Sequence, residues 1–80
     1  MEDDTTELAS RLDNLISEEP LLQVFRFAHL PAHLLVISAS FAELACFIVE
    51  DLPRNPERST ALRKLREAKD CAVTARLWQQ

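Results

Sequence analysis

The segment Pro53-Arg54-Asn55-Pro56 decides the fold of this 80-residue chain, because it separates two long stretches of helical pattern. Pro53 ends the first stretch, since a proline inside a helix removes a backbone hydrogen bond and clashes with the preceding turn. Asn55 is a favoured N-cap residue and Pro56 suits the first helical position, so the next helix begins at once and runs to about Trp78. Two long helices joined by so short a turn lie antiparallel. The sequence therefore predicts an all-α protein built on an antiparallel helical hairpin.

The first helix of this hairpin is expected to start at Pro31 and to continue to Leu52, with no other breaker between them. Its apolar residues recur at intervals of three and four, as they do on one face of a helix. They are Leu34, Ile37, Phe41, Leu44, Ala45, Ile48, Val49 and Leu52. The stripe is wide, so we expect the helix to bury it against more than one neighbour.

The second helix of the hairpin combines a row of small residues with a row of basic ones. The small row predicts a narrow seam that lets two helix backbones come close. It consists of Ala61, Leu65, Ala68, Ala72 and Ala75. Arg58, Lys69 and Arg76 fall within about 20° of one another around the helix. Two interpretations of these bases stay open: an anion-binding edge beside an apolar floor, or cations that pair with Glu43 and Glu50 or face water.

The part of the chain that precedes the hairpin is acidic. Residues 1–20 contain seven acids and one base, whereas residues 54–80 contain seven bases and three acids. We expect an acidic N-terminal helix that begins near Thr6, or a partly ordered arm, attracted to the basic end within or between chains. Residues 21–80 are expected to form the helical-hairpin domain, and its first segment, Leu21–Phe27, a single helical turn that leads into a loop.

Composition excludes several classes of function. The chain has no glycine, which the phosphate loops of Rossmann and Walker-type nucleotide sites require. Its two cysteines and two histidines lack zinc-site spacing, and no arrangement of serine, histidine and acid suggests a catalytic triad. We therefore expect no enzyme, no metal and no cofactor. The net charge of −4 argues against binding of duplex nucleic acid, whose partners are normally basic.

The location expected from the sequence is the cytoplasm. The acidic start of the chain lacks the positive region of a secretory signal. The longest apolar stretch, Leu34–Val49, is interrupted by polar residues and is shorter than a membrane-spanning helix, so no membrane partner is expected. In this compartment Cys46 and Cys71 are expected to be reduced thiols with packing roles.

The start of the second hairpin helix is a further candidate for anion binding. Free backbone amides and the positive end of the helix dipole favour a phosphate group there. Arg54, Arg58 and the hydroxyls of Ser59 and Thr60 gather at the same place. The alternative is an ordinary capped helix without a ligand.

The residue pattern of one segment is more specific than the composition of the chain alone explains. Residues 53–68 resemble the helical-hairpin family of phage anti-CBASS sponge proteins, usually called anti-CBASS protein two. In that family a proline-containing turn leads into a Glu-x-Ser-x-Ala-Leu-x-Lys-Leu-x-Glu-Ala pattern and an alanine-rich helix. The matching residues are Glu57, Ser59, Ala61, Leu62, Lys64, Leu65, Glu67 and Ala68. Phe27, His29 and Pro31 are similar to the family's aromatic-His-Pro entrance to the preceding helix, so the resemblance covers about residues 25–76.

The resemblance implies a phage or prophage anti-defence protein that acts in the cytoplasm of an infected bacterium. Proteins of this family form homo-oligomers, typically hexamers, that sequester cyclic di- and trinucleotide messengers without cleaving them. The ligand residues indicated by the resemblance and by the helix start are Phe27, His29, Arg54, Arg58, Ser59, Thr60 and Lys64. The alternative is a helical assembly or adaptor module that binds a protein partner and no small ligand.

Overall fold

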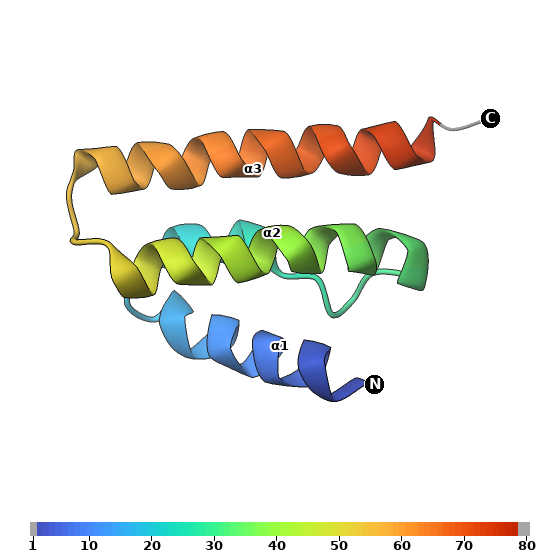
Figure 1. Ribbon diagram of the computed structural model, residues 1–80, viewed down its shortest axis with the longest axis horizontal. Coiled ribbons are helices and arrows are strands. Elements are labelled where there is room, and N and C mark those ends of the chain that lie inside the picture. Colours follow the sequence, from blue (N-terminus) through green and yellow to red (C-terminus); the bar gives the residue numbers. More distant parts are fainter. Residues whose placement is uncertain (1, 79–80) are drawn as a thin grey trace.

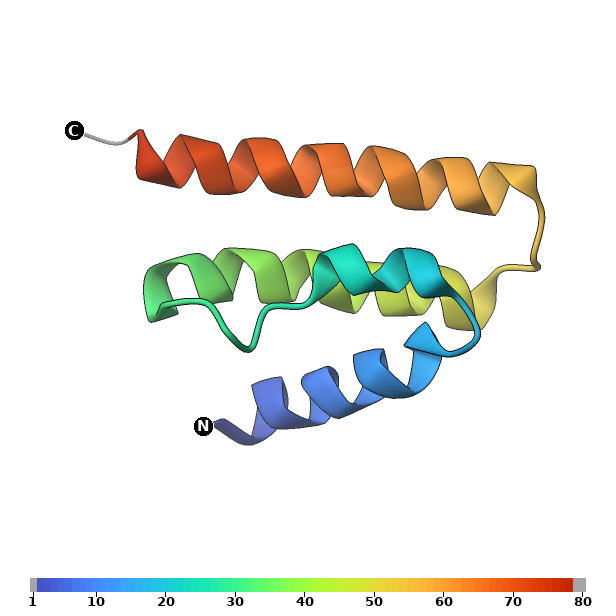
Figure 2. The ribbon, with the colours of Figure 1, turned by 180° about the vertical axis from the view of Figure 1, so that it is seen from behind.

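The computed structural model describes residues 2–78, which form four helical elements and contain no strand. The elements are α1 (Glu2–Ile16), the 3₁₀-helix η1 (Pro20–Phe25), α2 (Ala32–Asp51) and α3 (Pro56–Leu77). The predicted all-α class is confirmed. Figure 1 shows α2 and α3 side by side and antiparallel, with α1 along the opposite flank of α2. Figure 2 shows the same arrangement from behind, with η1 in front of α2.

The turn between α2 and α3 has the capping that the sequence predicts. The side-chain oxygen of Asn55 accepts a hydrogen bond of 2.9 Å from the Arg58 backbone N–H, and Pro56 is the first residue of α3. This bond satisfies one of the amide groups that have no partner within the helix. The other end of α3 closes at Trp78, whose backbone N–H donates to the carbonyl oxygen of Thr74.

The N-terminal segment is a helix that contributes to the core. α1 begins at Glu2, earlier than the expected start near Thr6. Leu12 of α1 and Leu62 of α3 are both buried in one hydrophobic core, so the acidic segment packs on the hairpin. η1 provides the expected helical turn before a loop, and it buries Leu22 and Phe25.

The buried face of α2 is made of small residues and differs from the predicted stripe. Its buried residues are Ser38, Ala39, Ala42, Ala45, Cys46 and Val49. α1, η1 and α3 all contact α2, and small side chains let these neighbours come close to its backbone. The predicted stripe is wrong at Leu44 and Leu52, which are 47% and 44% exposed.

The predicted seam of α3 is also wrong in part. Ala68 and Ala75 are exposed, and the buried residues of α3 are Arg58 and Leu62. The close approach of backbones therefore depends on the small residues of α2. On α3 the basic strip turns towards the rest of the protein together with part of the seam, since Ala61, Leu65 and Ala72 are half-buried.

Within residues 2–78, no helical element covers the side of the α2–α3 layer opposite η1. Figures 1 and 2 place η1 on a single side of this layer. At about 100° per residue, Leu44 projects some 160° away from the buried Ala42. Val36, Leu44 and Phe47 are each about half exposed. We call this apolar surface of α2 the open face.

α2 is also long and apolar enough to cross a membrane, when only length and composition are considered. It has 20 residues, more than the apolar stretch of 34–49 that the sequence suggested. Core helices of soluble proteins meet the same criteria, and here α1, η1 and α3 all contact this helix.

Candidate functional site

The basic strip of α3 contacts backbone oxygens of other elements. The Lys69 ammonium donates to the Val24 carbonyl oxygen at 2.8 Å, and the Arg76 guanidinium donates to the His33 carbonyl oxygen at 3.0 Å. The strip pairs with neither Glu43 nor Glu50. Glu50 instead accepts from Arg11 of α1, at a shortest distance of 2.8 Å. Both interpretations made from the sequence therefore missed the partners of these cations.

Arg58 is the most enclosed member of the strip. One terminal nitrogen of its guanidinium donates to a carboxylate oxygen of Glu19 at 2.8 Å. The other donates to the carbonyl oxygens of Val49 and Leu52 at 3.1 and 3.0 Å. The side chains of Arg58 and Glu19 are each only 7% exposed.

The position of Arg58 follows from the physics of a helix end. The last carbonyl groups of α2 have no partner within the helix and carry its partial negative charge. A guanidinium at this place donates hydrogen bonds to these carbonyl groups and offsets their partial negative charge. Glu19 in turn neutralises the positive charge of the guanidinium. The Arg58 Nε–H is buried without a partner among the described residues. Of its five N–H donors, three are used in these bonds, so any phosphate bound by Arg58 would have to displace Glu19 or reach the Nε–H or the second N–H of the nitrogen that bonds Glu19.

The other residues predicted at the start of α3 lie near one another, but their side chains differ in exposure and in hydrogen bonding. The Arg54 side chain is largely exposed and donates to the Glu18 carbonyl oxygen at 2.6 Å. Ser59 and Thr60 are half-buried, and the Thr60 hydroxyl donates to the Pro56 carbonyl oxygen at 3.0 Å. Arg54 thus provides the accessible positive charge of this cluster.

Lys64 lies on the outer surface of α3. Its side chain is 72% exposed, and its ammonium is 4.0 Å from a carboxylate oxygen of Glu67. Such an exposed pair contributes little to stability, so the ammonium is free to change partners.

Phe27 and His29 belong to a different region of the molecule. Phe27 is 1% exposed and packs in the core, so its ring offers no open face for stacking on a base. His29 is exposed in the loop between η1 and α2. Within one chain the structure therefore divides the seven predicted ligand residues into two groups.

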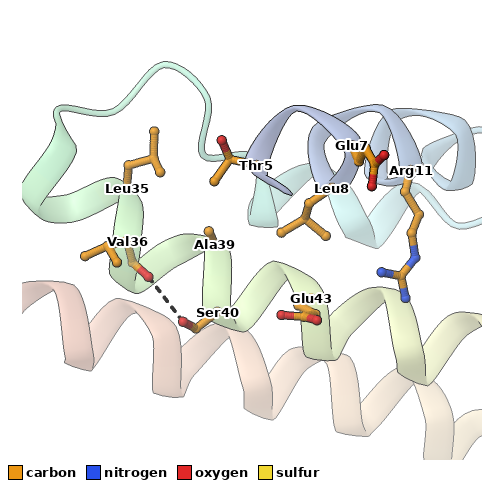
Figure 3. A pocket seen from close by; sticks show the side chains of 9 residues that line it. All are labelled: Thr5, Glu7, Leu8, Arg11, Leu35, Val36, Ala39, Ser40 and Glu43. Atoms are coloured by element: carbon orange, nitrogen blue, oxygen red, sulfur yellow. Dashed lines mark hydrogen bonds between the residues drawn. The ribbon is translucent and has the colours of Figure 1, made fainter. Parts of the chain in front are cut away.

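Two concave surfaces flank α2. The first, between α1 and α2, has a volume of about 580 Å³, and Leu8, Leu35 and Ala39 line it. Figure 3 shows the Arg11 side chain extending from α1 towards α2, with Glu7 on α1 and Glu43 on α2. Because Arg11 is bonded to Glu50, this groove offers two unneutralised carboxylates and suits no phosphate.

The second concave surface lies between α3 and the loop that follows η1. It has a volume of about 480 Å³, and His29, Ser38 and Lys69 line it. Ser38 is not among the site residues predicted from the sequence. The signal available was a serine four residues before Ala42, on the face of α2 that the structure buries.

The pKa values of two side chains of α2 are shifted from their ordinary values. Burial raises the pKa of the Cys46 thiol, which keeps it protonated at neutral pH. The hydrogen bond from Arg11 lowers the pKa of the Glu50 carboxyl group. Both effects are local to the α1–α2 contact and lie away from the predicted ligand residues.

Residues 2–78 contain no group of three or more His, Cys, Asp or Glu side chains placed to hold a metal ion. Comparison of this chain with models of known protein families, with curated proteins and with solved structures finds no match.

Proposed function

We propose that this chain is a phage or prophage anti-defence protein that sequesters cyclic oligonucleotide messengers, without cleaving them, as a homo-oligomer. The observation that carries the proposal is the resemblance of residues 53–68 to the anti-CBASS sponge family. The capped Asn55-Pro56 start of α3 and its antiparallel packing on α2 agree with the hairpin that the resemblance implies.

The open face supports self-association. Val36, Leu44 and Phe47 expose apolar side chains on one helix of a chain too small to build a large core of its own. Ala68 and Ala75 of α3 are exposed and project about 100–120° from Lys69, which points to η1. A second copy packed here would bury apolar surface at a place where small side chains allow close approach.

The ligand would lie between protomers. The accessible predicted residues, Arg54, Lys64 and His29, occupy separate parts of one chain. Symmetric assembly brings such surfaces of different protomers together. A hexamer is the assembly that the resemblance implies.

The experiment that tests this function combines native mass spectrometry with titration calorimetry. The expected result is a homo-oligomer that binds at least one cyclic di- or trinucleotide and releases it intact after denaturation. A folded protein that binds no member of a panel of these messengers would refute sequestration. Recovery of a linear nucleotide would refute the absence of cleavage.

A variant of the open face tests the assembly. Phe47→Glu places a charge in the proposed interface, and the expected result is a fall in oligomer mass with the helical circular dichroism retained. Arg63→Glu is the matched control, because Arg63 is exposed on α3 about 140° from Ala68. Equal masses for Phe47→Glu and the unmodified protein would exclude the open face as the interface.

The second candidate is an assembly or adaptor module that binds a protein partner and no small ligand. The intramolecular contacts of Arg58, Lys69 and Arg76 favour it, because these bases already have partners in their own chain. This function predicts silent nucleotide titrations, together with a partner whose binding is lost in Phe47→Glu.

A further inference from the structure

A cleft on the η1 side of the molecule has the features of a small-ligand site. α3 forms one wall, the loop at residues 26–31 forms the other, and α2 forms the floor. Figure 2 views the molecule from this side, with η1 and the loop in front of α2 and below α3. The volume of about 480 Å³ lies within the range of sites for small organic molecules.

The floor of the cleft contains a polar group without a partner. Ser38 is 2% exposed and lines the cleft, and among the described residues its hydroxyl has no hydrogen-bond partner. Arg58 Nε is the fully buried polar side-chain atom without a partner in the described part of the chain, so the Ser38 hydroxyl oxygen still reaches the open space of the cleft and is available to a ligand. Ser40, two residues along the same helix, differs, since its hydroxyl donates to the Val36 carbonyl oxygen at 3.2 Å.

Lys69 brings a positive charge to the same cleft. Its ammonium donates to the Val24 carbonyl oxygen and lies 3.1 Å from a carboxylate oxygen of Asp70. An ammonium has three N–H donors, so one is left for a ligand after these two contacts. The side chain is 15% exposed and is held over the Phe25 ring, at 6.0 Å from the ring centroid, so the charge is held in place before any ligand arrives.

The remaining groups of the cleft favour an anion attached to an apolar body. His29 adds a further donor at the loop, where Arg26 already lies 3.5 Å from Asp13, and Leu30 and Val73 supply apolar surface. Asp70 is the acidic residue of the cleft, and its charge is shared between Lys69 and Arg66, which is 3.8 Å away. The cleft therefore contains more hydrogen-bond donors than free acceptors.

From these contacts we infer that the cleft binds an organic phosphate, with the Ser38 hydroxyl and the Lys69 ammonium donating to phosphate oxygens and Leu30 and Val73 packing on the attached group. This deepens the proposed function in one respect: a cyclic oligonucleotide is such a ligand, and the cleft would be one of its contact sites. The inference itself needs only the cleft, because any phosphate monoester or diester of suitable size has the same chemistry.

The probe for the test is adenosine 5′-monophosphate, titrated into ¹⁵N-labelled protein and followed by NMR. The expected result is saturable shifts of the amide signals of Leu30, Ser38 and Val73. Adenosine, which lacks the phosphate, should produce no such shifts. Ser38→Ala should weaken binding about ten- to hundredfold, as expected when a hydrogen bond to a charged group is removed.

Ser40→Ala is the matched control, since Ser40 is an exposed serine on the same helix and does not line this cleft. It should bind adenosine 5′-monophosphate like the unmodified protein. The melting temperature of Ser38→Ala should equal or exceed that of the unmodified protein, because the lost hydroxyl has no partner. Loss of binding would then report the ligand contact and not misfolding.

Three outcomes separate this inference from the proposed function. Absence of shifts at the cleft with adenosine 5′-monophosphate, or equal affinities of Ser38→Ala and the unmodified protein, would overturn the inference. Binding of cyclic oligonucleotides with unchanged affinity in Ser38→Ala would overturn the cleft as one of their contact sites while the proposed function stands. Binding of adenosine 5′-monophosphate at the cleft, with no cyclic oligonucleotide bound, would support the inference and refute sequestration.

Discussion

Glu19 and Arg58, 39 residues apart in the sequence, form a buried ion pair with a nitrogen–oxygen distance of 2.8 Å. Arg58 also donates to the carbonyl oxygens of Val49 and Leu52 at the end of α2. This guanidinium therefore joins α3 to the end of α2 and to the residue that precedes η1.

Arg58→Ala is expected to destabilise the protein by about 3–5 kcal/mol, because it leaves the buried Glu19 carboxylate with only the exposed Arg54, 3.9 Å away, as a counter-charge. Urea denaturation at fixed protein concentration measures this change. Arg63→Ala is the control, since Arg63 is exposed on the same helix, and its effect should stay within about 0.5 kcal/mol.

The double substitution Glu19→Leu with Arg58→Met separates the ion pair from the packing around it. Replacing both partners by apolar residues of similar size should cost much less than Arg58→Ala alone, since no charge is left buried. Additive effects of the two single substitutions would contradict a coupled pair.

Lys69→Met is expected to weaken the attachment of η1 to α3. It removes the hydrogen bond to the Val24 carbonyl oxygen while it keeps most of the side-chain volume. The expected loss of unfolding free energy is about 1.5–3 kcal/mol, with faster amide exchange in η1. Lys64→Met, at an exposed position of α3, should change neither quantity, and equal effects of the two variants would contradict the contact.

The Arg11–Glu50 pair should make a small, acid-sensitive contribution to stability. Arg11 lowers the pKa of Glu50, so the contribution is complete above the ordinary glutamate pKa of about 4.3. It is lost as the pH falls through the lower pKa of the folded protein. Because both side chains are 38% exposed, Glu50→Gln should cost less than about 1 kcal/mol at pH 7 and nothing at strongly acidic pH. A pH-independent cost, measured by thermal unfolding beside Glu43→Gln as the control, would argue against this linkage.

The two thiols should differ in reactivity. Cys46 is buried and burial raises the pKa of its thiol, whereas Cys71 is exposed. The thiolate is the reactive form, so one thiol per chain should react with a disulfide reagent in the native protein and the second only after unfolding. Rapid reaction of native Cys71→Ser would show that Cys46 is accessible.

The ends of the two hairpin helices and the order of the elements could be predicted from the sequence, because they depend on residues that are neighbours in the chain; the start of α1 at Glu2 was not predicted. Asn55 caps α3 through the amide of Arg58, and Pro56 has a backbone angle already suited to a first turn. These contacts span a few residues, so the sequence pattern contains nearly all the information that they need. The antiparallel course of α2 and α3 follows from the short turn between them.

The partners of the side chains required the tertiary structure. Periodicity correctly placed Arg58, Lys69 and Arg76 on one strip of α3, but it defines only the angles between residues of the same helix. Which strip faces inward depends on the elements packed beside it, and here Glu19, η1 and the end of α2 offer carboxylate and carbonyl oxygens to that strip.

The same reason applies to α2. Its large apolar residues and its small residues each recur at helical spacing, and the sequence favoured the larger ones for the interior. The tertiary structure buries Ala42 and Ala45 and leaves Leu44 half exposed, because neighbours on several sides can approach one helix only over small side chains. Local sequence thus determined where the two hairpin helices begin and end, whereas contacts between residues far apart in the chain decided which face of each helix is buried.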